Sequence, residues 1–201
     1  MKSLLLKDIC IIGKRGVLIP LLALFFAVFA AMQANFLYFA MTTMMLMMLC
    51  LSTMAYDQND GFDAYILALP IHKQAVVLEK YVLGLLALMV SLLIVLICTL
   101  VVGRQKADIP SYLLMQSAIG FIFMAINYPL IFRFGFEKSR VWYILISMAL
   151  ATSTGIAVNL GLYYTIHTAI TIMLPFSALA LVIISYLVSL HIIKNKEIFE
   201  N

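Results

Sequence analysis

A polar interval covers residues 57–80 of an otherwise mostly apolar chain, and its side chains are spaced for binding rather than for catalysis. Within it, apolar side chains recur at the i, i+3, i+4 and i+7 positions that share one helix face: Phe62, Tyr65, Ile66 and Leu69. Asp60 can cap the start of this helix, and Asp63 adds negative charge to its first turn. Pro70 cannot continue the helix, so a second helix follows it and runs through Lys80 into the next apolar run.

Two partners fit such a short helix, and the pattern leaves both open. An amphipathic helix can rest its apolar face on lipid headgroups and acyl chains. It can equally present that face to another protein, and long polar loops inside compact membrane proteins are uncommon unless they have a function.

Motifs for catalysis and for metal or nucleotide binding are absent from the sequence. Gly13-Lys-Arg-Gly16 has neither the length nor the register of a phosphate-binding loop, and no H-E-x-x-H or G-x-S-x-G occurs. Cys10, Cys50 and Cys98 show no paired spacing, which favours free thiols packed as small apolar groups. We therefore expect no enzyme activity and no cofactor bound by this chain.

The composition is that of a membrane protein. Hydrophobic residues make up 65% of the chain, charged residues 11%, and the mean hydropathy is +1.11, whereas soluble domains carry about a quarter charged residues. The net charge of +4 and a pI near 9.0 could suit nucleic acid. The basic residues are dispersed at the ends of apolar runs, however, which is typical of membrane topology, so we expect no nucleic-acid partner.

The apolar runs predict an all-α polytopic membrane protein that forms one domain over residues 1–201. An amphipathic interfacial helix is expected at 1–13, and six transmembrane helices of roughly 20 residues each follow it. Their expected ranges are about 17–32, 36–55, 81–102, 111–132, 141–160 and 170–190. The last uncharged stretch is longer than two spans need, which predicts a re-entrant or interfacial piece around 159–168.

Six spans place both termini on one side, and the basic residues indicate which side that is. One set of segments holds most of them: Lys2, Lys7, Lys14, Arg15, Lys73, Lys80, Arg133, Lys138, Arg140, Lys194 and Lys196. The opposite set holds Arg104 and Lys106. The positive-inside rule therefore predicts a cell-membrane protein with cytoplasmic termini and a cytoplasmic 57–80 loop.

A few polar residues remain in or beside the membrane segments and could line a pathway for a transported molecule. They are Gln116, Asn127, Asn159 and His167. Hydrogen bonding between helices explains such residues equally well. The expected spans contain no Asp, Glu, Lys or Arg, which disfavours an ion-coupled transporter because such proteins carry intramembrane charges.

The order of these elements resembles the membrane subunits of ABC-2 type transporters. The likeness extends to the small permeases that include the membrane subunits of the phenol-soluble modulin exporter. The matching positions are Phe62, Leu67, Leu69, Pro70, Ile71, Lys73, Val76, Val77, Lys80 and Tyr81. His72 departs from this pattern, in which a serine is expected, and that weakens the cap of the second helix.

The resemblance implies that the first helix of the loop is a coupling helix, seated in a groove of a separate ATPase subunit that binds ATP and Mg²⁺. The permease would act as a dimer, homomeric or heteromeric, with two such ATPases. The residues implied in coupling are Asp60, Phe62, Asp63, Tyr65, Ile66, Leu69, Pro70, Ile71 and Lys73.

The sequence thus favours the permease of an ATP-driven exporter for a hydrophobic or amphipathic substrate, either a peptide or a lipid-like molecule. The alternative is a membrane immunity or structural protein that binds a toxic peptide without transporting it. A membrane enzyme is disfavoured by the missing catalytic motifs.

Overall fold

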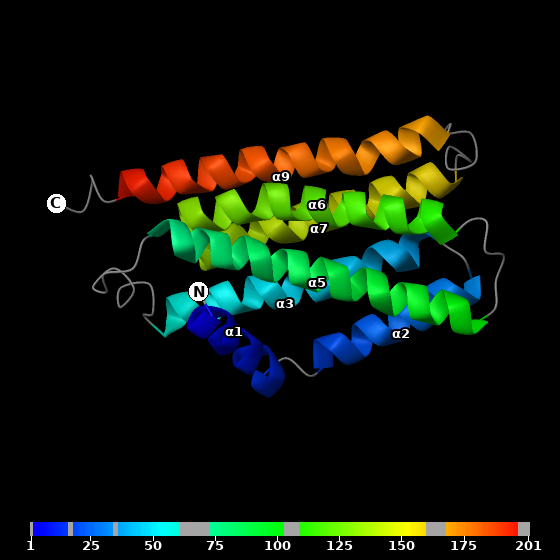
Figure 1. Ribbon diagram of the computed structural model, residues 1–201, viewed down its shortest axis with the longest axis horizontal. Helices are drawn as coiled ribbons and strands as arrows, with labels where there is room; N and C mark the ends of the chain where they lie inside the picture. The colour runs from blue at the N-terminus through cyan, green and yellow to red at the C-terminus, as the bar shows by residue number, and fades with distance from the viewer. Residues whose placement is uncertain are drawn as a thin grey trace.

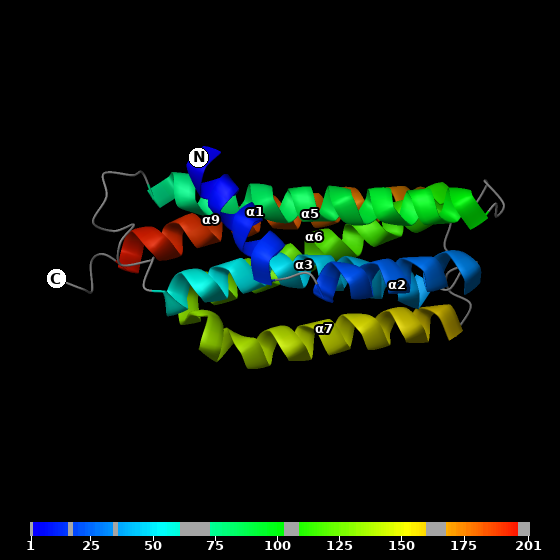
Figure 2. The same ribbon diagram turned by 90° about the horizontal axis from the view of Figure 1, so that it is seen from below.

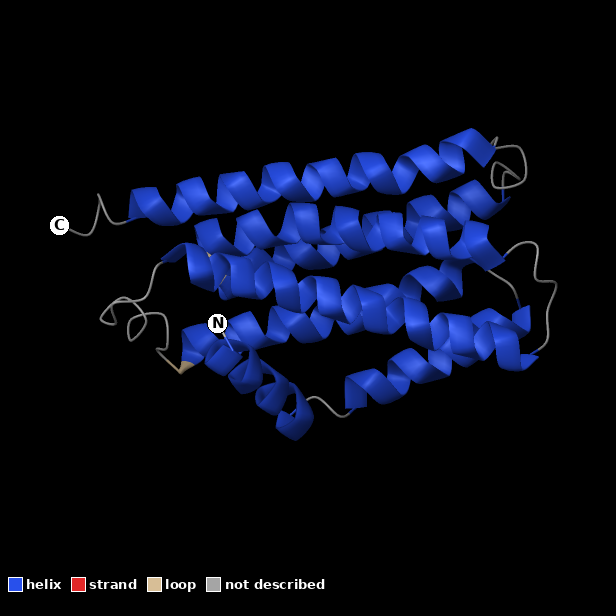
Figure 3. Cartoon of the chain, viewed as in Figure 1, coloured by secondary structure: helices blue, strands red, loops and turns tan. Residues whose placement is uncertain are grey.

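The fold was taken from a computed structural model, which describes residues 2–15, 18–33, 36–60, 73–102, 109–159 and 168–196. Within these ranges the backbone is helical except at Asp60 and Gly135, and they contain no strand (Figure 3). The all-α class expected from the sequence is confirmed for this part of the chain.

The helices form one elongated bundle with a short helix crossing it at one end (Figures 1 and 2). In chain order they are α1 (Lys2–Arg15), α2 (Leu18–Gln33), α3 (Phe36–Asn59), α5 (Lys73–Val102), α6 (Ile109–Phe134), α7 (Phe136–Asn159) and α9 (Thr168–Lys196). Helices α2 to α9 run along the long axis, whereas α1 lies obliquely across α3 and α5. Each expected span therefore coincides with a helix, and the expected interfacial helix coincides with α1.

Four of the described helices are long and apolar enough to cross a membrane. They contain the segments Leu37–Gln58, Gln74–Val102, Ile109–Phe134 and Met173–Ile193. A fifth candidate arises only if α1 and α2, whose axes differ by 78°, are taken as one broken span. Helix α7 is not among these candidates. Six spans therefore stay a prediction.

The core of the bundle is built from small and flexible apolar side chains. On α2, the buried face consists of Ala23, Ala27, Ala30 and Ala31, which allows close packing against α3. Gly84 of α5 and Gly120 of α6 do the same where these two helices meet. A Cβ at Gly84 would collide with the Tyr128 side chain, and one at Gly120 would collide with Leu88.

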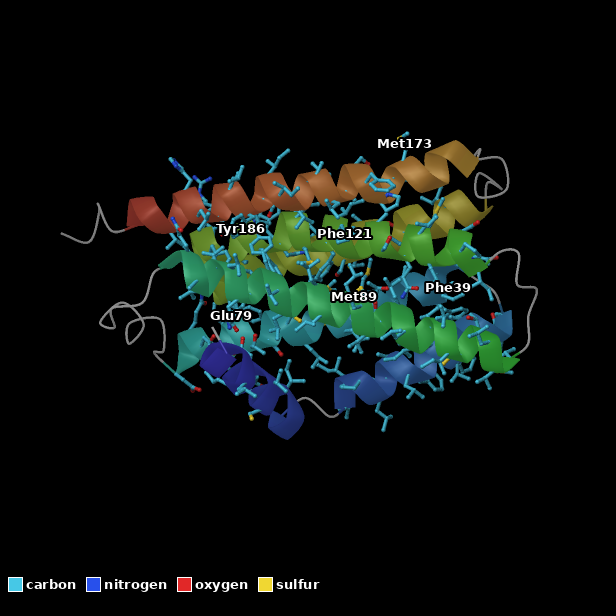
Figure 4. All side chains as sticks on the ribbon, in the orientation of Figure 1. Phe39, Glu79, Met89, Phe121, Met173 and Tyr186 are labelled. Carbon is cyan, nitrogen blue, oxygen red and sulfur yellow. The ribbon has the colours of Figure 1, made fainter. Side chains whose placement is uncertain are left out.

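All the connections into and out of the 61–72 segment lie at one end of the bundle. Asn59 ends α3 there and Lys73 begins α5, while the α6–α7 junction and the end of α9 reach the same end (Figure 1). Figure 4 places Glu79 at this end, beside α1, and Phe39 toward the other end. The expected second helix of the 57–80 interval is the beginning of α5, which runs from Lys73 without a break into the expected span, whereas α3 extends into the interval through Asn59.

Candidate functional site

A group of charged side chains is buried where α1 crosses the beginning of α5 and the end of α3. We call it the charged cluster, and it consists of Lys7, Asp8, Asp57, Glu79 and Lys80. Asp8 is 0% exposed, Glu79 1%, and Asp57 and Lys80 5% each. The expected spans at 36–55 and 81–102 contain none of these residues, but α3 and α5 extend beyond those ranges. Asp57, Glu79 and Lys80 all lie within the apolar helices that qualify as spans.

Lys80 is the central cation of the charged cluster. Its Nζ donates to Asp8 Oδ2 and to Asp57 Oδ2, both at 2.6 Å, so one ammonium group joins three helices. Lys7 Nζ donates to Asp57 Oδ1 at 2.5 Å and lies 3.3 Å from Asp8 Oδ1. Glu79 Oε2 lies 3.8 Å from Lys80 Nζ. Burial of a charge costs several kcal/mol unless it is paired. Displacement of any one of α1, α3 and α5 would therefore leave buried charges on the other two without a partner.

The end of α3 carries a second connection, next to Asp57 in the sequence. Gln58 Oε1 accepts a hydrogen bond of 2.6 Å from the backbone N–H of Phe136, the first residue of α7. Gly135 lies between α6 and α7 with φ of 80°, a conformation that side-chain-bearing residues rarely adopt. Ser139 Oγ completes the junction by donating to the carbonyl of Leu130 at 2.9 Å.

The start of α5 carries a third connection, next to Lys80. The Tyr81 hydroxyl lies 2.6 Å from Ser185 Oγ and 3.0 Å from Ser189 Oγ, all three residues being buried. Its ring also makes edge contacts with the rings of Tyr128 on α6 and Tyr186 on α9. Tyr81 therefore joins α5 to α9 one residue after Lys80 joins α5 to α1 and α3.

These contacts make both stems of the 61–72 segment part of one polar network. The stem at residues 57–58 reaches α1, α5 and the α6–α7 junction, and the stem at residues 80–81 reaches α1, α3 and α9. A displacement of the segment would reach most helices of the bundle. The arrangement suits force transmission, not bond-making chemistry.

The charged cluster contains three carboxylates and two lysines, and its ion pairs join each carboxylate to a lysine. Among the described residues, no group of three or more His, Cys, Asp or Glu side chains is placed to hold a metal. Cys10, Cys50 and Cys98 are all free thiols, and the Cys50 thiol donates to the Leu83 carbonyl at 3.6 Å.

Most residues implied in coupling fall outside the described part of the chain. These are Phe62, Asp63, Tyr65, Ile66, Leu69, Pro70 and Ile71. Asp60 is described and exposed, and its backbone N–H donates to the Tyr56 carbonyl at 2.9 Å, as in a last turn of α3. Lys73 begins α5, but its side chain is not described.

The polar residues expected in the spans separate into two groups. Gln116 is 0% exposed and Asn127 1%, and both lie on α6 inside the bundle. Asn127 Nδ2 donates to the Phe123 carbonyl at 2.9 Å. Asn159 ends α7 with a side chain that is not described, and His167 lies outside the described residues, as does most of the expected re-entrant piece.

Sequence reasoning missed the charged cluster because its members are far apart in the chain. Asp8 and Lys80, for example, are 72 positions apart. One signal was present. Asp8 is an acid in a short helix whose other charges are basic, beside its apolar face. An acid in that position is best explained by a buried cation facing it.

Comparison with known proteins gives one match. A family model described as "ABC-2 family transporter protein" matches residues 3–194, nearly the whole chain. No curated protein matches the sequence, and no solved structure matches the fold.

Proposed function

The chain belongs to the ABC-2 family of transporter proteins, and from this membership we propose that it is the permease of an exporter driven by a separate ATPase chain. Family membership makes it a membrane-spanning component of an ABC transporter. The sequence contains no phosphate-binding loop of its own, which supports a partner as the source of ATP hydrolysis.

The segment between Asp60 and Lys73 is the part that would dock on the ATPase. Its apolar face consists of Phe62, Tyr65, Ile66 and Leu69, and aromatic side chains seated in pockets commonly carry most of the energy of such interfaces. The observation that carries the proposal is the polar network at both stems of this segment, because it connects the docking site to the membrane helices.

The transmission step follows from the continuity of α5. This helix runs unbroken for 30 residues, or about 45 Å at 1.5 Å per residue, and it contains both Lys80 and Tyr81. Closure of the ATPases would push on the segment, and α5 would tilt as a rod fixed at its base to α1, α3 and α9. Reversing a 99:1 conformational equilibrium requires about 5.5 kcal/mol of differential binding, which ATP-driven closure can supply.

The orientation and the substrate are inferred from charge and composition. The described basic positions at the charged-cluster end favour a cytoplasmic location for that end and for both termini. An apolar seam between two permease copies, identical or related, suits an amphipathic peptide or a lipid-like molecule. The sequence resemblance to the small permeases of the phenol-soluble modulin exporter also favours a peptide substrate.

The docking surface can be tested by co-expressing the chain with a candidate ABC ATPase from the same genome and measuring co-purification. Phe62→Asp and Leu69→Asp place a charge on the proposed apolar face and are expected to abolish the complex. Ala64→Asp is the matched control, because residue 64 would lie on the opposite face of the expected helix.

Equal co-purification of all three variants would contradict the docking surface. Binding of a toxic peptide by the chain alone, with no ATPase in the complex, would instead support the immunity-protein alternative.

A further inference from the structure

Three helices bring a fully buried polar side chain to the same level in the middle of the bundle. Thr43 of α3, Ser91 of α5 and Gln116 of α6 are each 0% exposed. This level is separate from the charged cluster, and none of the three residues takes part in the network described above.

The neighbouring contacts fix the register of α3 and α6. Phe39 stacks on Tyr112 with ring centroids 5.0 Å apart, and the Met47 side chain approaches Gly120. Thr43 lies one turn after Phe39, and Gln116 lies one turn after Tyr112, so the two polar residues face each other.

The register of α5 against α6 is fixed in the same way. Gly84 meets the Tyr128 and Met124 side chains, and Leu88 meets Gly120. These helices run in opposite directions, so the next turn of this face of α5, which contains Ser91, lies level with Gln116.

Of the three side chains, Thr43 and Ser91 make a hydrogen bond and Gln116 does not. Thr43 Oγ1 donates to the Phe39 carbonyl at 3.2 Å, and Ser91 Oγ donates to the Leu88 carbonyl at 2.7 Å. Neither the oxygen nor the nitrogen of the Gln116 amide has a hydrogen-bond partner within the described part of the chain. A buried primary amide without partners costs about 1–3 kcal/mol, so this residue requires an explanation.

We propose that Thr43, Ser91 and Gln116 form an internal hydration site at which water binds the Gln116 amide between α3, α5 and α6. Water is the ligand that matches these groups, because it can donate to the amide oxygen and accept from the amide nitrogen. The hydroxyl oxygens of Thr43 and Ser91 retain lone pairs, and either can accept its remaining proton; buried waters usually bind such otherwise unsatisfied groups.

The site also indicates where the bundle can change shape, an extension that rests on the proposed function. A contact made through water can slide without losing direct hydrogen bonds, and here it lies along the length of α5. Tilting of α5 would therefore widen this level first. Asn127, three turns along the same face of α6, has an unpartnered Oδ1 and continues the polar line toward the charged-cluster end.

Hydration is tested by water-edited solid-state NMR on the ¹⁵N-labelled protein in lipid bilayers, with the Gln116 side-chain signal assigned by its loss in Gln116→Met. We expect magnetisation from water to reach Gln116 Nε2 several times faster than it reaches the backbone amides of Ala118 and Phe123. Those residues are equally buried on α6 but are bonded within the helix. A Gln116 signal no faster than these amides would overturn the hydration site.

The link to transport is tested by thiol labelling in a variant whose native cysteines are replaced, with Gln116→Cys introduced and Ala118→Cys as control. In the complex with its ATPase, ATP is expected to accelerate modification of the Gln116→Cys thiol by a small methanethiosulfonate, and to leave the Ala118→Cys thiol unchanged. Rapid water transfer in the NMR experiment with no effect of ATP here would leave the hydration site standing and remove the motion attributed to α5.

Discussion

The two halves of this bundle are held together by different means. At the end near the 61–72 segment, α1, α3 and α5 meet through the charged cluster, and α7 and α9 join them through hydrogen bonds with Gln58 and Tyr81. Farther along the axis most contacts are made by apolar side chains, among them alanines and methionines.

This difference indicates where the contacts between helices require a precise geometry. Charged and hydrogen-bonded contacts have one correct geometry, whereas packing of flexible apolar side chains tolerates small shifts. The polar end can therefore transmit a displacement without slipping, and the apolar body can accommodate it.

The largest effect is expected for Lys80→Met. Removing this ammonium group leaves two buried carboxylates short of a cation, which typically costs about 3–5 kcal/mol. The loss is measured by chemical unfolding in detergent micelles. Lys138→Met is the control, because Lys138 is exposed and surface substitutions usually stay within about 0.5 kcal/mol. Equal stability of the two variants would mean that the charged cluster does not hold the polar end.

The apolar packing of α5 against α6, one turn after Tyr81, is tested by Gly84→Ala. The added methyl group would enter the space of the fully buried Tyr128 ring, and overpacking of this kind costs about 1–3 kcal/mol. Gly13→Ala is the control, since nothing lies within 4 Å of a Cβ there. If Gly84→Ala unfolds at the same denaturant concentration as the wild type, the α5–α6 contact is looser than described.

Tyr81→Phe tests the contribution of the Tyr81 hydroxyl to the α5–α9 contact separately from the contribution of its ring. The variant keeps the edge contacts with Tyr128 and Tyr186 but loses the hydrogen bonds to the two serines, at a cost of about 1 kcal/mol. A double-mutant cycle with Ser185→Ala measures the coupling. Strictly additive losses would show that the short oxygen–oxygen distance contributes nothing.

The smallest global effect is expected for Gln58→Ala, which removes the acceptor for the Phe136 N–H. The change in unfolding free energy should be about 1 kcal/mol, but hydrogen exchange at the Phe136 amide should accelerate markedly because exchange reports local opening. Gln74→Ala, at an exposed position on α5, provides the comparison. Unchanged exchange at Phe136 would contradict the connection between α3 and the α6–α7 junction.

The sequence was sufficient to locate the helices, because uncharged apolar runs leave few other choices in a membrane. It also predicted that the helix before Lys80 continues into the next span, as α5 does, but it placed the end of α3 too early, because α3 continues through Asp57. Polar residues at the end of an apolar run are interpreted as loop residues unless their partners in the fold are known. The burial of Gln116 and Asn127 followed from their position in an apolar run.

The charged cluster could not be predicted in the same way. Its pairs depend on how α1 lies across α3 and α5, and no local pattern encodes that crossing. Tyr81 entered the sequence argument only as part of a family motif, and its contacts with Ser185 and Ser189 come from the packing of α9 alone.

The position of Lys80 in the chain has a consequence for biosynthesis. When α1 to α3 have left the ribosome, Asp8 and Asp57 share Lys7 as their only cation from the charged cluster, and the second lysine is still to come. We expect α1 to settle onto the bundle only once α5 has been inserted. Nascent chains stalled when α3 but not α5 has emerged from the ribosome should then lose α1 to added protease, whereas chains stalled after α5 has emerged should protect it. Protection at both lengths would show that the amino-terminal helix folds into place before its main counter-ion exists.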